Sequence, residues 1–242
     1  MTESTSTPTI SAPLPSFWED VIDIFVSPAA VFRRRQNTSV WPPMLFVALS
    51  IAVISFATFN TLEPIFDAEF SRATAKMIAA NPQLTPEMLE KGRGIQIAVA
   101  KYGLAVLMIV FMFVIGCVSW LIGKLFDSKQ TFNAALVVAA WAYMPRILGA
   151  LINAIQGLLM DPAKLTSLLA ISLSPARFMD SETTNPILYQ MAGRLDLITI
   201  WVTVLLAIGL AVTGKVSKGR AAIFGVIIWV VGSLPQIRQA MM

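Results

Sequence analysis

Five long apolar runs that are almost free of charge divide the chain. Each is close to the roughly 17–25 residues that a helix needs to cross the ~30 Å hydrocarbon layer of a membrane. The runs lack the alternation of a β-barrel strand, and backbone groups in lipid must be satisfied within the segment, so we expect helices. The predicted spans are 41–59, 102–123, 132–151, 197–214 and 221–237. The pattern therefore predicts an all-α integral membrane protein, built as a five-helix transmembrane bundle.

The connections between these spans differ in length, and the difference predicts a layout. Segments 127–131 and 215–220 are short, so spans two and three, and spans four and five, are expected to be antiparallel neighbours. Segments 60–101 and 152–196 are each about forty residues long. Because they follow the first and third spans, these two long loops lie on the same side of the membrane, which we expect to be the outer side.

Local signals predict where some of the helices begin or are distorted. Thr85 is a good N-cap in front of Pro86, and a helix that begins there can run into the second span. Asn185 and Pro186 begin another helix, which we expect to continue into the fourth span. Pro145 lacks an amide hydrogen, so the third span is expected to be distorted just before it.

The segment before the first span has two parts. Residues 1–16 are rich in Ser, Thr and Pro, and this composition predicts a disordered tail. In residues 17–35, apolar side chains at helical spacing stand opposite Glu19, Asp20 and Asp23, which predicts an amphipathic helix. The remaining residues, 36–237, form the membrane domain.

Two placements of the amphipathic segment are open. It could lie in the headgroup region of the membrane, with Trp18 and Phe25 in the interface and the basic run Arg33, Arg34 and Arg35 near lipid phosphate. It could instead pack against the protein's own helices. The first placement makes these five residues membrane-surface contacts.

Composition supports the membrane assignment and excludes several kinds of chemistry. Hydrophobic residues make up 56% of the chain and charged residues 13%, against roughly 45–50% and about 25% in an average soluble domain. Histidine is absent and Cys117 is the only cysteine, so disulfide frameworks, Cys/His zinc sites and Ser–His catalysis lack their residues. No nucleotide-binding or hydrolase signature occurs. We expect no enzyme activity, no catalytic residue, no metal site and no cofactor.

The basic residues indicate an orientation. The formal net charge is +4, but the basic residues are scattered over the loops, so lipid and not nucleic acid is the expected partner. With the amino terminus inside, compact segments at the inner boundary hold eight of the eighteen basic residues: Arg33, Arg34, Arg35, Lys124, Lys129, Lys215, Lys218 and Arg220. Short basic segments carry most weight in the positive-inside rule. We expect a cytoplasmic amino terminus in a bacterial inner membrane.

Three charged residues lie within or directly beside the spans. Lys101 precedes the second span, Arg146 lies in the third, and Asp196 precedes the fourth. A charge in hydrocarbon is costly and often functional. One interpretation is a polar site for a lipid headgroup or an ion. The other is an ion pair between Arg146 and Asp196 that fixes the third and fourth helices together.

Several phrases of the sequence resemble the Yip family of five-span proteins in its bacterial branch. They are SFWEDVIDIFVSPAAVFRRR before the first span, AALVVAAWAYMPRILGALINAI in the third, and RLDLITIWVTVLLAIGLAVTGKVSKGRAAIFGVIIWVV across the last two. The resemblance covers about residues 17–237. It implies the five-span fold. Eukaryotic members are linked to Rab-type GTPases, but their amino-terminal motifs are not found here, so that role does not carry over.

The resemblance also implies a range of functions. Some bacterial members are associated with ABC-type export systems as accessory membrane subunits, which favours a noncatalytic accessory or scaffold subunit that binds another membrane protein or a transporter subunit. A lipid-organising or curvature protein is one alternative, and a small-solute channel or transporter is a second. A homo-oligomer is also open.

Overall fold

The computed structural model describes residues 15–81, 83–161, 164–165 and 167–241. The tail predicted over residues 1–16 therefore lies almost entirely outside the described residues. Within these ranges every regular element is a helix, which confirms the predicted all-α class. In chain order the main helices are α1 (Phe17–Val26), α2 (Pro28–Arg35), α3 (Trp41–Ala80), α4 (Pro86–Ala98), α5 (Leu104–Lys124), α6 (Phe132–Ala142), α7 (Pro145–Leu159), α8 (Pro186–Arg194), α9 (Leu197–Thr213), α10 (Lys218–Val231) and α11 (Leu234–Met241).

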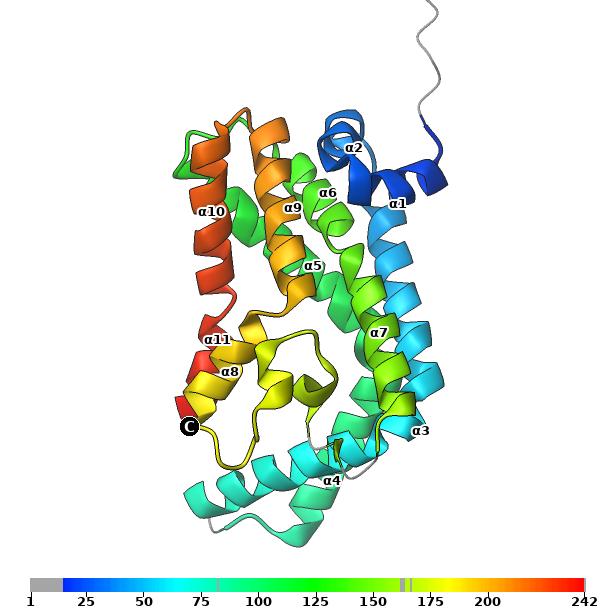
Figure 1. Ribbon diagram of the computed structural model, residues 1–242, viewed down its shortest axis with the longest axis vertical. Helices are drawn as coiled ribbons and strands as arrows, with labels where there is room; N and C mark the ends of the chain where they lie inside the picture. Colours follow the sequence, from blue (N-terminus) through cyan, green and yellow to red (C-terminus); the bar gives the residue numbers. More distant parts are fainter. Residues whose placement is uncertain (1–14, 82, 162–163, 166, 242) are drawn as a thin grey trace, which may run out of the picture.

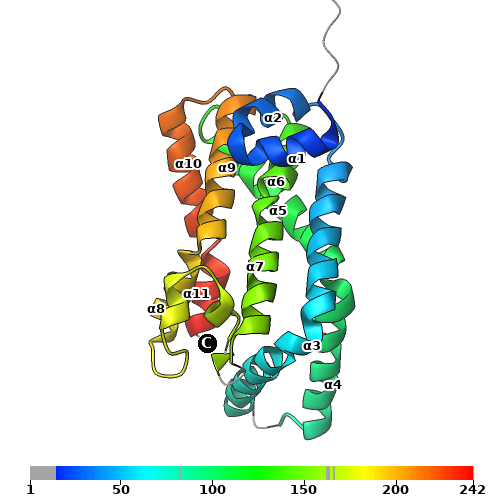
Figure 2. The same cartoon turned by 45° about the vertical axis from the view of Figure 1, so that its right-hand side comes forward.

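The long helices form a bundle, and the two shortest connections lie at one end of it. Figures 1 and 2 show the first part of α3, the α6–α7 pair, α9 and α10 running along the long axis, with α1 and α2 lying across one end and the later part of α3 across the other. The loops after α5 and α9 are at that same end, whereas α4 and α8 are toward the other. As expected, α5 packs against α6 and α9 against α10. The two long connections thus share one end of the bundle.

Four helical stretches among the described residues are long and apolar enough to cross a membrane, and a bent pair raises the number to five. The stretches are Trp41–Ala79, Pro86–Lys124, Phe132–Leu159 and Lys218–Arg238, and the bent pair joins α8 to α9 at an angle of 56°. Most extend beyond the predicted spans. The first does so because 41–80 contains no glycine and only one interior proline, Pro64, so the helix continues into the amphipathic part of the loop.

The local signals for helix ends are confirmed. The Thr85 side chain accepts a hydrogen bond from a backbone amide of the first turn of α4, and Asn185 does the same for α8. The third span breaks before Pro145, where α6 ends and α7 begins. The helix from Pro186 does not run straight into the fourth span, because α8 ends at Arg194 and the chain turns before α9.

Helix α6 is the centre of the bundle. All nine residues from Ala134 to Ala142 are buried, and five of them are alanines. In the membrane-crossing window of α6–α7, 61% of residues are buried, against 28% or less in the other three long stretches. Glycines let neighbouring helices come close: a Cβ on Gly116 of α5 would lie 2.6 Å from the Leu136 side chain, and one on Gly209 of α9 would collide with Val138. The other spans therefore pack around α6 and turn apolar faces toward lipid.

Candidate functional site

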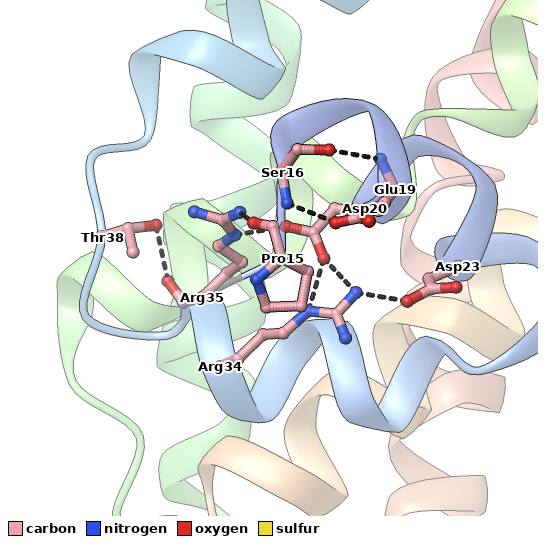
Figure 3. Close-up of polar contacts among 8 residues, drawn as sticks. All are labelled: Pro15, Ser16, Glu19, Asp20, Asp23, Arg34, Arg35 and Thr38. Atoms are coloured by element: carbon pink, nitrogen blue, oxygen red, sulfur yellow. Dashed lines mark hydrogen bonds and ion pairs between the residues drawn. The ribbon is translucent and has the colours of Figure 1, made fainter. Parts of the chain in front are cut away.

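The N-terminal hairpin (residues 15–36) is held together by a network of charged side chains, drawn in Figure 3. Asp20 of α1 is fully buried and forms ion pairs with Arg34 and Arg35 of α2. Arg34 also binds Asp23 at 2.5 Å, and Arg35 donates to the Pro15 carbonyl at 2.6 Å. Two consecutive arginines thus clamp α1 against α2 through one carboxylate.

A second set of polar contacts fixes the start of α1. The Ser16 hydroxyl accepts from the amide of Glu19 at 3.2 Å, and the Glu19 carboxylate accepts from the amide of Ser16 at 2.5 Å, which is a capping box. Burial alone would lower the pKa of Arg34, but its hydrogen bonds to Asp23 and Asp20 outweigh this and raise the pKa above its ordinary value. The hairpin is therefore a fixed, charge-balanced unit.

One side of the hairpin packs on the bundle. Ile24, Val31 and Phe32 are fully buried in the main core, which includes residues of α6 and α9. The Phe25 ring lies edge-on to Trp201 of α9, with their centroids 5.2 Å apart. Of the five residues considered for membrane contact, the structure thus places Phe25, Arg34 and Arg35 in internal contacts and leaves Arg33 exposed. Trp18 is largely exposed, although one edge of its ring packs against Phe46 of α3, with the centroids 5.5 Å apart.

The other side of α1 is an exposed apolar stripe. Trp18, Ile22 and Val26 are spaced four residues apart and are 64%, 67% and 73% exposed. Residues at this spacing lie on one face of a helix. Exposed Arg33 belongs to the same hairpin. The hairpin therefore presents apolar side chains outward from a rigid support, beside the end of the bundle that carries the short loops.

A cavity of about 460 Å³ lies inside the bundle. Its walls come from α3, α5 and α7, from residues 168–173 and from the start of α9. Most of the lining is apolar. Arg146 and Asp196, two of the three charged residues singled out from the sequence, both line it, so the structure brings them together.

Arg146 and Asp196 do not form the direct ion pair considered from the sequence. One Arg146 guanidinium nitrogen donates to the Thr199 hydroxyl at 3.1 Å, and this hydroxyl donates in turn to Asp196 over 3.4 Å. Asp196 also accepts from the backbone amides of Thr199 and Leu173, each at 3.0 Å. The carboxylate is thus the N-cap of α9 and the anchor of the preceding loop, and the contact with Arg146 runs through Thr199.

Lys101 lies apart from this pair. It is in a single turn of π-helix (Val99–Gly103) between α4 and α5. Its ammonium group lies 5.3 Å from the ring centroid of Phe59 and 5.6 Å from that of Phe56. Phe59 is itself part of the cavity wall, but Lys101 is not. The favourable contact of the cation is with aromatic rings of α3.

The sequence reasoning missed Thr199 and Arg194. Thr199 is the third residue after Asp196, which is the position that an N-cap side chain binds, and this spacing could have identified it. Arg194 donates to the Ser233 hydroxyl at 3.0 Å and to the Trp229 carbonyl at 3.3 Å, which ties α8 to the α10–α11 junction. Arg194 lies two residues before Asp196 in the sequence, and this position beside the start of the fourth span could have identified it. Across the described residues, no group of three potential metal-ligating side chains occurs.

The long apolar helices packed around the buried α6 define a multi-pass helical membrane protein. A family model described as the Yip1 domain matches residues 22–236. The chain belongs to this family. It is similar to the membrane protein YknW of Bacillus subtilis, at 27% identity over 207 residues, which cover 85% of this chain and 83% of the relative. No solved structure matches the chain.

Replacing Asp20 tests the hairpin network. Asp20→Ala leaves two arginines without their shared partner, and breaking a buried pair from one side costs about 3–5 kcal/mol. We expect about 3 kcal/mol, because both arginine side chains keep 18% exposure. The thermal unfolding midpoint of the purified protein should fall, and trypsin should cleave faster after residues 33–35. Asp23→Ala is the matched control: this half-buried carboxylate has one arginine contact, worth at most about 1 kcal/mol. Equal, small losses in both variants would contradict the network.

Variants of Asp196 and Arg146 test the bridged contact. Asp196→Ala removes a helix cap, and we expect a loss of about 1–2 kcal/mol in stability. Asp196→Asn should lose less, since its amide oxygen still accepts a hydrogen bond. Because Thr199 mediates the contact, combining Asp196→Ala with Arg146→Ala should give nearly additive losses, with a coupling of about 0.5 kcal/mol. A coupling energy of several kcal/mol, measured by thermal unfolding, would instead indicate a direct ion pair between Arg146 and Asp196.

Proposed function

We propose that the protein is a noncatalytic accessory or scaffold subunit of a membrane assembly such as an export system. The observation that carries the proposal is the exposed stripe Trp18, Ile22 and Val26 on a hairpin that is clamped to the bundle. A rigid apolar surface at a membrane boundary binds a partner at a low entropic cost, because few groups must be ordered on binding.

The chemistry of the cavity supports a noncatalytic role. Asp196 is the one carboxylate among its lining residues, and its oxygens serve as the cap of α9 and the acceptor for Leu173. Catalysis by a general base or nucleophile needs a group free to meet a substrate. The family and the relative are named for no reaction: the first is a domain family and the second a membrane protein.

The proposed location is a bacterial inner membrane, with the N-terminal hairpin and the loops after α5 and α9 in the cytoplasm. These segments carry basic residues at the membrane boundary, as the positive-inside rule requires. Reporter fusions after Arg35, Lys129 and Lys218 should all report cytoplasm. Three periplasmic signals would invert the orientation, and a mixed result would contradict the number of spans.

A change on the exposed stripe tests the accessory role. The full-length protein is purified in a mild detergent from its native membrane, and partners are quantified by mass spectrometry against the bait. The stripe variant combines Trp18→Ala, Ile22→Ala and Val26→Ala. The control shortens three valines of similar spacing and exposure on α5: Val106→Ala, Val110→Ala and Val114→Ala. One membrane protein should be recovered with the wild type and the control and be lost with the stripe variant. Equal recovery from all three would contradict the proposal.

A lipid-organising or curvature protein is the second candidate, and exposed Trp18 together with Arg33 favours it. Aromatic and basic side chains on an interfacial helix bind anionic membranes. In that case the stripe variant would keep its protein partners but lose an effect on reconstituted anionic vesicles. The third alternative, a channel or transporter, would show solute flux that depends on Arg146 or Asp196. Self-association of the wild type in the same purification would indicate a homo-oligomer.

A further inference from the structure

Arg146 is a cation in the middle of a membrane-spanning stretch. It lies close to midway between Phe132 and Leu159, which bound the α6–α7 span. It donates a hydrogen bond to the Thr199 hydroxyl, and its guanidinium carbon lies 5.9 Å from the centroid of the Tyr143 ring. No carboxylate among the described residues pairs with it directly. A charge near the middle of a membrane-spanning helix is costly when it has no partner, so an anionic partner would stabilise the site.

The charges around the cavity do not balance. Arg194 lies two residues before Asp196 and directly follows Gly193, which is part of the cavity wall. Its own hydrogen bonds go to neutral oxygens of Ser233 and Trp229. The cluster therefore holds two arginines and one aspartate, whose oxygens are engaged by the α9 cap and Leu173. One negative charge is missing, and a singly charged anion would supply it.

The guanidinium of Arg146 keeps the right donors for such an anion. Nη2 donates one of its two hydrogens to the Thr199 hydroxyl. Its other hydrogen, together with the parallel N–H of Nε or Nη1, forms a fork that can bind the two oxygens of a carboxylate or phosphate group. Arg146 also lines the cavity, so its guanidinium is on the wall of a partly open pocket within the bundle.

The rest of the cavity suits a hydrocarbon chain. Ile51 and Ile54 of α3, and Leu104 and Met108 of α5, contribute apolar side chains to its wall, and the ring of Phe59 adds an aromatic surface. A volume of about 460 Å³ falls within the range of small-molecule sites, which are mostly apolar with a few converging polar groups. A site with one anion-binding fork and apolar walls fits an amphiphile.

We propose that this cavity binds a singly charged anionic amphiphile, with its charged group on Arg146 and its hydrocarbon chain along α3 and α5. The shared chemistry is one negative charge on a planar or tetrahedral oxygen group attached to an apolar tail. A fatty-acid carboxylate and a phospholipid phosphodiester both provide it. The proposal does not rest on the accessory role, because the stripe on α1 and the cavity are formed by different residues.

Binding of defined probes to the delipidated full-length protein in a neutral detergent tests the proposal. Palmitate and phosphatidylglycerol are the anionic probes, phosphatidylcholine is the zwitterionic comparison, and inorganic phosphate is the anion without a tail. Affinities are measured by native mass spectrometry and by competition. We expect palmitate, phosphatidylglycerol or both to bind the wild type at least about tenfold more tightly than phosphatidylcholine, and inorganic phosphate not to compete.

Two variants separate the charge from the apolar wall. Arg146→Gln removes the cation and should weaken binding at least about tenfold, since hydrogen bonds to charged groups are the stronger kind. Ala100→Phe fills the cavity from its apolar side, leaves every charge in place, and should weaken binding as well. Arg220→Gln is the matched control: it also removes one positive charge, but from an exposed pair with Asp127. It should bind as the wild type does.

The outcomes identify the ligand or overturn the site. If only palmitate binds in a way that depends on Arg146, the ligand's charged group is a carboxylate. If only phosphatidylglycerol does so, it is a phosphodiester. Unchanged affinity in both Arg146→Gln and Ala100→Phe overturns the proposal, as does equal binding of the anionic and zwitterionic probes. If Arg146→Gln does not fold, Ala100→Phe and the comparison of probes on the wild type decide the question on their own.

Discussion

Polar groups that enter hydrocarbon must find their partners inside the protein, because lipid offers none. This constraint accounts for where the chain bends. Pro145 breaks the third span at the buried centre of the bundle, where neighbouring helices surround the freed backbone groups. The fourth span bends between Arg194 and Leu197. At this bend the Asp196 carboxylate accepts from the amide of Thr199 in the first turn of α9, and the Leu197 amide donates to the Leu173 carbonyl at 3.3 Å.

The same constraint explains why α6 is central. Its alanines bring no polar atoms and little volume, so α5 and α9 approach it at Gly116 and Gly209. Close approach between helices provides van der Waals contact, which drives association where both lipid and protein are apolar. The hairpin then closes one end by placing Phe32 in the same core. The transmembrane helices and the N-terminal hairpin therefore share one core.

The sequence predicted the class of fold and several helix starts because those signals are local. Apolar run lengths indicate spans, and Thr85 and Asn185 mark helix starts with their own side chains. Contacts between residues far apart in the sequence were harder to predict. Asp20 stands on the polar face of α1, which favours solvent, yet it is buried because Arg34 and Arg35 fold back over it. Topology suggested that Arg146 and Asp196 lie near each other, and both line the cavity, but their contact runs through Thr199 because Asp196 immediately precedes α9 and caps it.

The hairpin network and the charged residues at the cavity differ in their balance of charge, and this difference separates their roles. In the hairpin, Asp20 and Asp23 face Arg34 and Arg35, so two negative charges meet two positive ones, and the cluster needs nothing further. At the cavity, Arg146 binds Thr199, the nearby Arg194 binds Ser233 and Trp229, and the carboxylate of Asp196 is already engaged by backbone amides. A balanced cluster stabilises a fold, whereas an unbalanced one beside an apolar space favours a ligand of opposite charge. The cavity is therefore the part of the molecule that is adapted to bind an amphiphile, and the hairpin is the part that is adapted to present a fixed surface.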